Sequence, residues 1–241
     1  MKRKSINPEY FYSALAIGLK SDIRDKMRDL RDYCELVQGT LEPLREKYAN
    51  MHKLRGDDDP EIIALLNRFS YRRHYERHNN FFVRTLVVEL FSTFESIFTE
   101  AHNYIVAVNK EQGIVKLPRE YKSQPKPITK ARDILIQFGF EFDFSKWYSL
   151  EQLANTRNIL AHAGGSVGKE FERSAQKIIR STSLIKMSIG DLLIDPAYIE
   201  ESIILVEDLL LSFHSQVHSK SKAAEAELRA EQNVEVSGVM Q

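Results

Sequence analysis

The 241-residue sequence has a single cysteine, Cys34. A disulfide framework and a cysteine-based zinc site are therefore excluded, and a reducing compartment fits best. Glycine and proline are scarce, with 10 and 7 residues, and the 43% of hydrophobic residues suffices for a core. Neither sign of charge dominates, since 34 basic side chains balance 34 acidic ones. Net charge gives no sign of nucleic-acid binding, so any basic surface must be local.

Long apolar runs are also lacking. None approaches the roughly 20 residues that span a bilayer. The start "MKRKSINPEYFYSALAIGLKSD" has a basic end and an apolar run, but Asn7, Pro8 and Glu9 interrupt it and no small-residue cleavage site follows. We interpret it as a first helix and expect a soluble, cytoplasmic protein without membrane contacts.

The N-terminal third predicts a helical hairpin over residues 20–77. Apolar side chains alternate at spacings of four and three along the first arm: Ile23, Met27, Leu30, Cys34, Val37, Leu41, Leu44, Tyr48 and Met51. Gly39 and Pro43 are expected to kink or restart this arm. Asp59 is expected to cap the second arm, with Pro60 as its first residue. Packing of this hairpin on the rest of the chain is favoured over an intermolecular coiled coil.

Residues 80–109 predict the most apolar helix. A wide apolar arc faces a narrow stripe of polar side chains: Glu89, Ser92, Thr93, Ser96, Glu100 and Asn103. Such a stripe allows close approach of another helix or lines a cleft. An ordinary solvated face is the alternative.

The rest of the chain alternates loops and short elements. Residues 110–129 predict a loop, 130–138 a short helix, and 184–194 a small hairpin around Gly190. Ser149 and Gln152 have the spacing of a capping box, and Gly164 is placed to end the helix that they begin. A last helix is expected over 196–217, followed by a polar, mobile tail from 219 to 241. The expected fold class is all-α.

The helix beginning at Ser149 carries three polar residues near its end: Arg157, Asn158 and His162. Arg157 falls within the apolar arc of that helix, where a cation needs an anionic partner or a route to solvent. Structural roles are open for each residue. Arg157 could pair with Glu89 or Glu95, Asn158 could cap or bridge, and His162 suits a helix C-terminus.

The stretch "RNILAH" (157–162) resembles the signature of the HEPN domain family, in which Arg and a polar residue are followed after three positions by His. The resemblance covers roughly residues 80–217. It implies a helical bundle, usually dimeric, and in many members a metal-independent ribonuclease without a cofactor. Arg157, Asn158 and His162 would be the catalytic residues. The setting would be a toxin–antitoxin or phage-defence system, with an inhibitor protein as a further partner.

Two basic stretches are candidate RNA contacts. "YRRHYERHNN" (71–80) contributes Arg72 and Arg73 beside tyrosines, although a solvated helix face is the alternative. The loop of residues 110–132 contributes Lys116, Arg119, Lys122 and Lys126. His74 and His78 share a face but lack the carboxylates of a known metal motif, so no metal site is expected.

The sequence thus predicts a helical extension (1–79), a HEPN-like bundle (80–218) and a tail (219–241). The predicted function is that of an endoribonuclease that uses the 2′-hydroxyl of RNA at a site shared by a homodimer. The alternative is a non-catalytic helical module that binds RNA or protein. The heptad pattern and the unassigned N-terminal region keep that alternative open.

Overall fold

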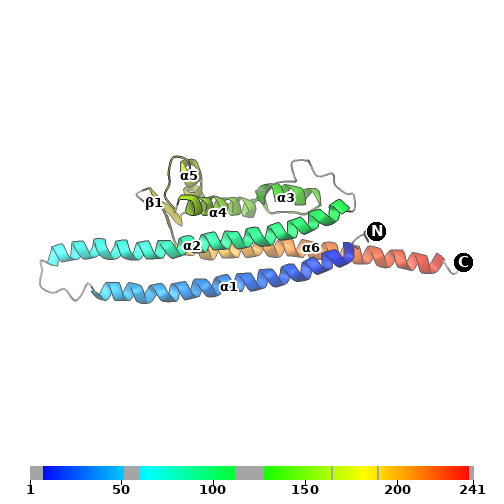
Figure 1. Ribbon diagram of the computed structural model, residues 1–241, viewed down its shortest axis with the longest axis horizontal. Helices are drawn as coiled ribbons and strands as arrows, with labels where there is room; N and C mark the ends of the chain where they lie inside the picture. Colours follow the sequence, from blue (N-terminus) through cyan, green and yellow to red (C-terminus); the bar gives the residue numbers. More distant parts are fainter. Residues whose placement is uncertain (1–7, 52–59, 112–127, 164, 189, 239–241) are drawn as a thin grey trace, which may run out of the picture. The chain divides into compact units, whose positions relative to one another are not determined.

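The computed structural model describes residues 8–51, 60–111, 128–163, 165–188 and 190–238. Figure 1 shows their helices and one hairpin in chain order. The elements are α1 (Pro8–Met51), α2 (Pro60–Glu111), α3 (Ile128–Gln137), α4 (Phe144–Ala163), α5 (Glu172–Ser181), β1 (Ile185–Ser188), β2 (Asp191–Ile194) and α6 (Ala197–Gly238). The all-α fold class and the small hairpin are confirmed. No helix among the described residues is both long and apolar enough to cross a membrane.

Helix α1 buries the part of the predicted apolar seam whose side chains the structure describes. Every seam residue from Ile23 to Val37 is buried. Pro43 lies inside α1, and the helix continues through Gly39 as well, so the expected restart is wrong. A proline removes only one intrahelical hydrogen bond, and the helical residues on either side of it continue the same helix.

Helix α2 is one continuous element in which the sequence predicted two. Its first residue is Pro60, as expected, and it passes through residues 77–80 without a break. The predicted boundary between residues 79 and 80 therefore lies inside a helix. Asn79 and Asn80 have low helix propensity, but two such residues do not interrupt a long helix that buries an apolar face.

The chain divides into two compact units, and several helices contribute residues to both. The aromatic unit contains Met1–Lys26, Ser92–Trp147 and Leu205–Gln241, and the motif unit contains Met27–Phe91 and Tyr148–Ile204. The predicted division into an extension, a bundle and a tail stays a prediction.

The aromatic unit is built around a cluster of rings from three parts of the chain. Phe98 stacks against Phe94 with ring centroids 5.3 Å apart, and it lies 5.5 Å from Trp147 and 5.3 Å from Phe213. Phe140 lies 5.3 Å from the same Phe213 ring. Helix α3, close to its predicted range, ends at Gln137. Gly139 follows in a turn with a φ of 74°, which redirects the chain so that Phe140 enters the cluster.

The motif unit contains the hairpin and α5. Strands β1 and β2 pair antiparallel, with Ile185 opposite Ile194, and Gly190 takes a φ of 82° in the turn. Helix α5 was not predicted. It buries only Ala175 and Ile178, and this narrow apolar face explains why the pattern was weak.

Helix α6 begins and ends differently from expectation. The Asp195 carboxylate accepts a hydrogen bond from the Ala197 amide at 3.0 Å, so the expected start at Asp195 and Pro196 is nearly right. The helix continues to Gly238, so its predicted end at residue 217 is wrong. Ala, Glu, Lys, Leu and Arg dominate "KAAEAELRAEQ" (222–232), and these residues favour a helix even without an apolar stripe.

Candidate functional site

Helix α4 carries the three candidate catalytic residues, and it starts five residues before the predicted Ser149. The Asp143 carboxylate accepts hydrogen bonds from the amides of Ser145 and Lys146, at 2.8 and 3.2 Å. Two of the amides that lack partners in a first turn are thereby satisfied. The hydrogen bond that the Ser145 hydroxyl donates to Asp143, together with the two from these amides, lowers the pKa of Asp143. The expected capping box at Ser149 and Gln152 is wrong, because both lie inside the helix and Gln152 is buried.

The apolar face of α4 is firmly packed around the motif. Leu150, Leu153 and Leu160 are buried, as the helical spacing predicted. Thr156 lies on the same buried face, one turn before Leu160, where it is fully buried and donates to the Gln152 carbonyl at 2.9 Å. The Thr156 side chain is also hydrogen-bonded to the Tyr198 phenol of α6, whose pKa burial raises. Packing thus holds the turns of α4 that precede and follow Arg157.

Arg157 is half-buried, and its guanidinium meets two groups of the motif unit. Nη1 donates to Oδ1 of Asn158 at 3.1 Å. The guanidinium carbon lies over the Phe91 ring, 5.7 Å from its centroid. An aromatic face stabilises a cation electrostatically while its ring packs against the side-chain stem. These contacts explain how a cation is accommodated beside the apolar arc of α4.

His162 is exposed in the last turn of α4. It follows Asn158 by four residues, so the two side chains lie on the same side of the helix, one turn apart. Asn158 is half-buried and occupied as an acceptor by Arg157. The structure thus brings Arg157 and Asn158 into direct contact and leaves the imidazole of His162 accessible to solvent.

The segment just after the motif is held by a residue that the sequence did not single out, Arg84 of α2. Gly165 takes a φ of 89°, and a Cβ atom there would lie 2.7 Å from Nη2 of Arg84. The same Nη2 donates to the Leu192 carbonyl at 3.1 Å, while the Leu192 amide donates to the Gly165 carbonyl at 3.0 Å. Burial lowers the pKa of the Arg84 guanidinium, and the negative charge of Asp191 acts in the opposite direction.

The chain that follows α4 is therefore held by the Arg84 side chain of α2 and by backbone hydrogen bonds to the hairpin. The Val167 amide adds a bond to the Gly190 carbonyl at 2.7 Å. Gly164, the predicted end of the helix, lies outside the described residues, and α4 ends at Ala163. The only signal in the sequence was an arginine within the apolar stretch "FFVRTLVVEL" (81–90), because its partner is distant in the chain.

The predicted polar stripe is divided between the two units. Glu89 belongs to the motif unit and is exposed. Ser92 and Ser96 belong to the aromatic unit, where Ser92 is half-buried and Ser96 exposed. Exposure of this kind fits a solvated face as well as a contact surface, so both interpretations remain.

The side chains of the candidate RNA contacts lie outside the part of the chain that the structure describes. Lys116, Arg119, Lys122 and Lys126 lie outside the described residues. Arg72 and Arg73 fall on the backbone of α2, but their side chains, like those of His74 and His78, are outside the described set. Among the side chains that are described, no three histidine, cysteine or acidic groups gather as metal ligands would.

Cys34 is a buried free thiol, and burial raises its pKa. The nearby Glu200 carboxylate acts in the same direction. A thiol in such surroundings is a poor nucleophile, so Cys34 is not a candidate for nucleophilic catalysis.

Comparison of the chain with protein-family models, curated proteins and solved structures gives no match. The function must therefore be argued from the residues themselves.

Proposed function

We propose that the protein is a metal-independent endoribonuclease of the HEPN type that acts as a homodimer in the cytoplasm. The observation that carries this proposal is the arrangement on α4. An exposed imidazole, His162, follows the hydrogen-bonded pair of Arg157 and Asn158 by one helical turn. RNA cleavage without a metal requires a titratable group that transfers protons and a cation that binds the phosphate, close together on one surface.

The chemistry uses the nucleophile that RNA carries. A base removes the proton of the 2′-hydroxyl, whose oxygen forms a bond to the adjacent phosphorus. The bond from phosphorus to the 5′-oxygen then breaks, and an acid protonates the leaving oxygen. The products are a 2′,3′-cyclic phosphate and a free 5′-hydroxyl. His162 is suited to either proton transfer, and the Arg157 guanidinium to the charge that develops on the non-bridging oxygens.

One histidine cannot readily serve both sides of the same phosphorus. A two-fold dimer that brings two α4 helices together would supply the second imidazole. Asn158 would then keep the Arg157 fork oriented toward the shared cleft through the hydrogen bond that it already accepts. The exposure of His162 in the single chain supports this arrangement. By the family resemblance, an inhibitor protein is a further candidate partner.

The test is cleavage of mixed RNA in EDTA by the wild type, His162→Ala and Arg157→Ala. We expect each variant to lose about 10²–10⁴ in rate, the usual range for acid–base catalysis. His218→Ala is the matched control, because His218 is also an exposed helical histidine but lies on α6. Full activity of His162→Ala, or loss of activity in EDTA, would contradict the proposal.

A second candidate function is a non-catalytic binding module. The contacts of Arg157 with Asn158 and Phe91 favour it, because they are also those of an arginine with a structural role. Thermal unfolding separates the two functions. A markedly lower Tm for Arg157→Ala, without any RNA cleavage by the wild type, would favour the binding module. An unchanged Tm for His162→Ala with loss of cleavage would favour the enzyme.

A further inference from the structure

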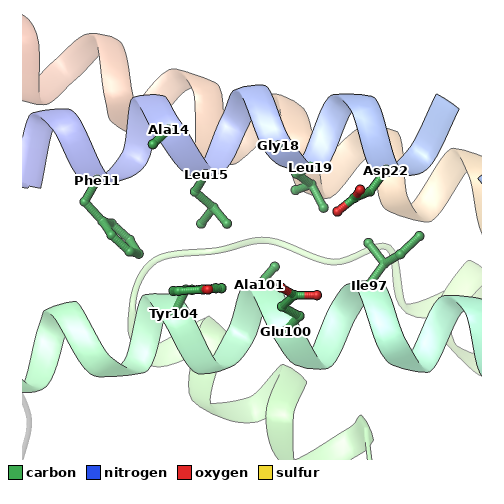
Figure 2. A pocket seen from close by; sticks show the side chains of 10 residues that line it. All are labelled: Phe11, Ala14, Leu15, Gly18, Leu19, Asp22, Ile97, Glu100, Ala101 and Tyr104. Atoms are coloured by element: carbon green, nitrogen blue, oxygen red, sulfur yellow. The ribbon is translucent and has the colours of Figure 1, made fainter. Parts of the chain in front are cut away.

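A groove runs between α1 and α2 within the aromatic unit, which contains none of the motif residues. Figure 2 shows it lined by residues 11–22 of α1 and residues 97–104 of α2. Its volume is about 320 Å³. Pockets that hold small organic molecules begin at about 300 Å³, so the groove suits a ligand of modest size. A groove that binds a protein helix would have to be larger.

One end of the groove is aromatic. The rings of Phe11 and Tyr104 lie 6.4 Å apart at an angle of 49°, and Tyr104 is 52% exposed. Figure 2 shows both rings at the same end, with Leu15 next to them on α1. Exposed aromatic surface beside an aliphatic wall favours a ligand with an apolar body.

The middle of the groove is open because its residues are small. Ala14, Gly18 and Ala101 carry little or no side chain there. A Cβ atom added at Gly18 would meet no atom within 4 Å. Glycine inside a helix is less favourable than alanine, and here neither close packing nor a positive φ requires it. Because no side chain fills the region beside Gly18, the middle of the groove is open to solvent.

The charged residues of the lining are both acidic, Asp22 and Glu100. Both are exposed, and no ion pair of either is seen within the part of the chain that the structure describes. Figure 2 shows Asp22 beyond Leu19, at the end opposite the rings, and Glu100 between the two ends. An apolar cleft rimmed by carboxylates is complementary to an apolar molecule that carries a positive charge.

We propose that this groove binds a small amphipathic organic cation, with an alkyl or aryl body and one protonated amino group. The body lies along Leu15, Gly18 and Ile97, with its far end against the Phe11 and Tyr104 rings. The ammonium group lies near Asp22 and Glu100. This site is independent of the proposed ribonuclease activity, since it uses no residue of the α4 motif.

The test is calorimetric titration of the full chain with n-octylamine and n-octanoate below their micelle concentrations at pH 7. The two probes share an alkyl chain of similar length and differ in charge, and the net charge of the protein is zero. We expect octylamine to bind about tenfold more tightly, because exposed ion pairs with two carboxylates give only modest selectivity. Equal affinity for both probes would overturn the proposal.

Two variants locate the site. Gly18→Leu fills the groove and should weaken octylamine binding at least about tenfold, as expected when side-chain atoms occupy the ligand's space. Gly39→Leu is the matched control, since Gly39 is another exposed α1 glycine with nothing within 4 Å, and binding should be unchanged. Binding that survives Gly18→Leu would place the ligand elsewhere and refute the site.

The Asp22→Asn, Glu100→Gln double variant tests charge recognition separately. It preserves the shape of the groove, and we expect it to bind octylamine and octanoate with similar affinity. Retained preference for the amine would show that these carboxylates do not select the charge. Circular dichroism of each variant confirms that the helical fold is intact, so a loss of binding reports on the groove.

Discussion

Substituting Gly165 with alanine perturbs the point where the chain leaves the motif helix. Gly165 has a φ of 89°, a conformation that an alanine adopts only with strain. The added Cβ would also lie 2.7 Å from Nη2 and 2.8 Å from Nε of Arg84, closer than real Cβ contacts. The guanidinium would have to move, and its hydrogen bond to the Leu192 carbonyl would be lost or weakened.

Two effects add to the expected cost. The left-handed backbone conformation costs an alanine about 1–2 kcal/mol. The loss of a hydrogen bond from a charged donor costs about 1.5–3 kcal/mol. We therefore expect Gly165→Ala to lower the free energy of unfolding by about 3 kcal/mol. Gly168→Ala is the control. No atom lies within 4 Å of a Cβ there and its φ is not in the left-handed range, so the change should stay within about 0.5 kcal/mol.

The assay is urea unfolding followed by circular dichroism, performed as a double-mutant cycle with Arg84→Ala. Without the guanidinium, Gly165→Ala should cost only the backbone strain of about 1–2 kcal/mol. The coupling between the two sites should then be at least about 1 kcal/mol. Additive losses would show that Arg84 does not pack on Gly165 as described. A loss for Gly165→Ala no larger than that for Gly168→Ala would refute the reasoning altogether.

The remaining predictions concern the core, the helix start, pH and assembly. Phe213→Ala should cost about 3–5 kcal/mol in urea unfolding, because the ring is buried against Phe98 and Phe140; a loss below 1 kcal/mol would contradict the aromatic core. Asp143→Ala should lower the Tm at pH 7. That difference should vanish in acid, because the folded-state pKa of Asp143 is lowered and its contribution is lost as the carboxylate is protonated. His214 has a pKa lowered by burial and then by His218, so its neutral form favours folding above about pH 6.5; stability should fall below that pH, and less so in His214→Gln. Sedimentation should show a dimer at micromolar concentration, and a monomer at high micromolar concentration would contradict the shared site.

Local signals in the sequence predicted many element boundaries. Pro60 begins α2, and Gly190 forms the turn of the hairpin. The ring of proline fixes its φ, and the missing Cβ of glycine permits a positive φ, so both positions can be predicted without tertiary context. The buried seam of α1 likewise follows from its spacing alone.

Some predicted helix boundaries were wrong because more than one residue or segment was suited to the same role. Ser149 and Asp143 both have suitable capping side chains, and the aromatic residues between them hid the earlier start. Residues 219–238 continue a helix that begins more than 20 residues earlier, so the costly nucleation step is already complete and moderate propensity suffices.

The candidate site was predictable only in part. The spacing placed Arg157, Asn158 and His162 near the end of one helix, and α4 carries them there. The contact of Arg157 with Phe91, and that of Arg84 with Gly165, join residues more than 60 positions apart. Such pairs follow from tertiary packing, which a single sequence does not encode in any local pattern.

The central claim is that His162 and Arg157 cleave RNA through its own 2′-hydroxyl. Its most direct test uses an RNA oligonucleotide with a mapped cleavage site and the same oligonucleotide with a single 2′-deoxy nucleotide at that site, both in EDTA. We predict cleavage of the first, with a 2′,3′-cyclic phosphate on the 5′ fragment, and no cleavage of the second at that position. Cleavage of the 2′-deoxy substrate at that position would contradict the account.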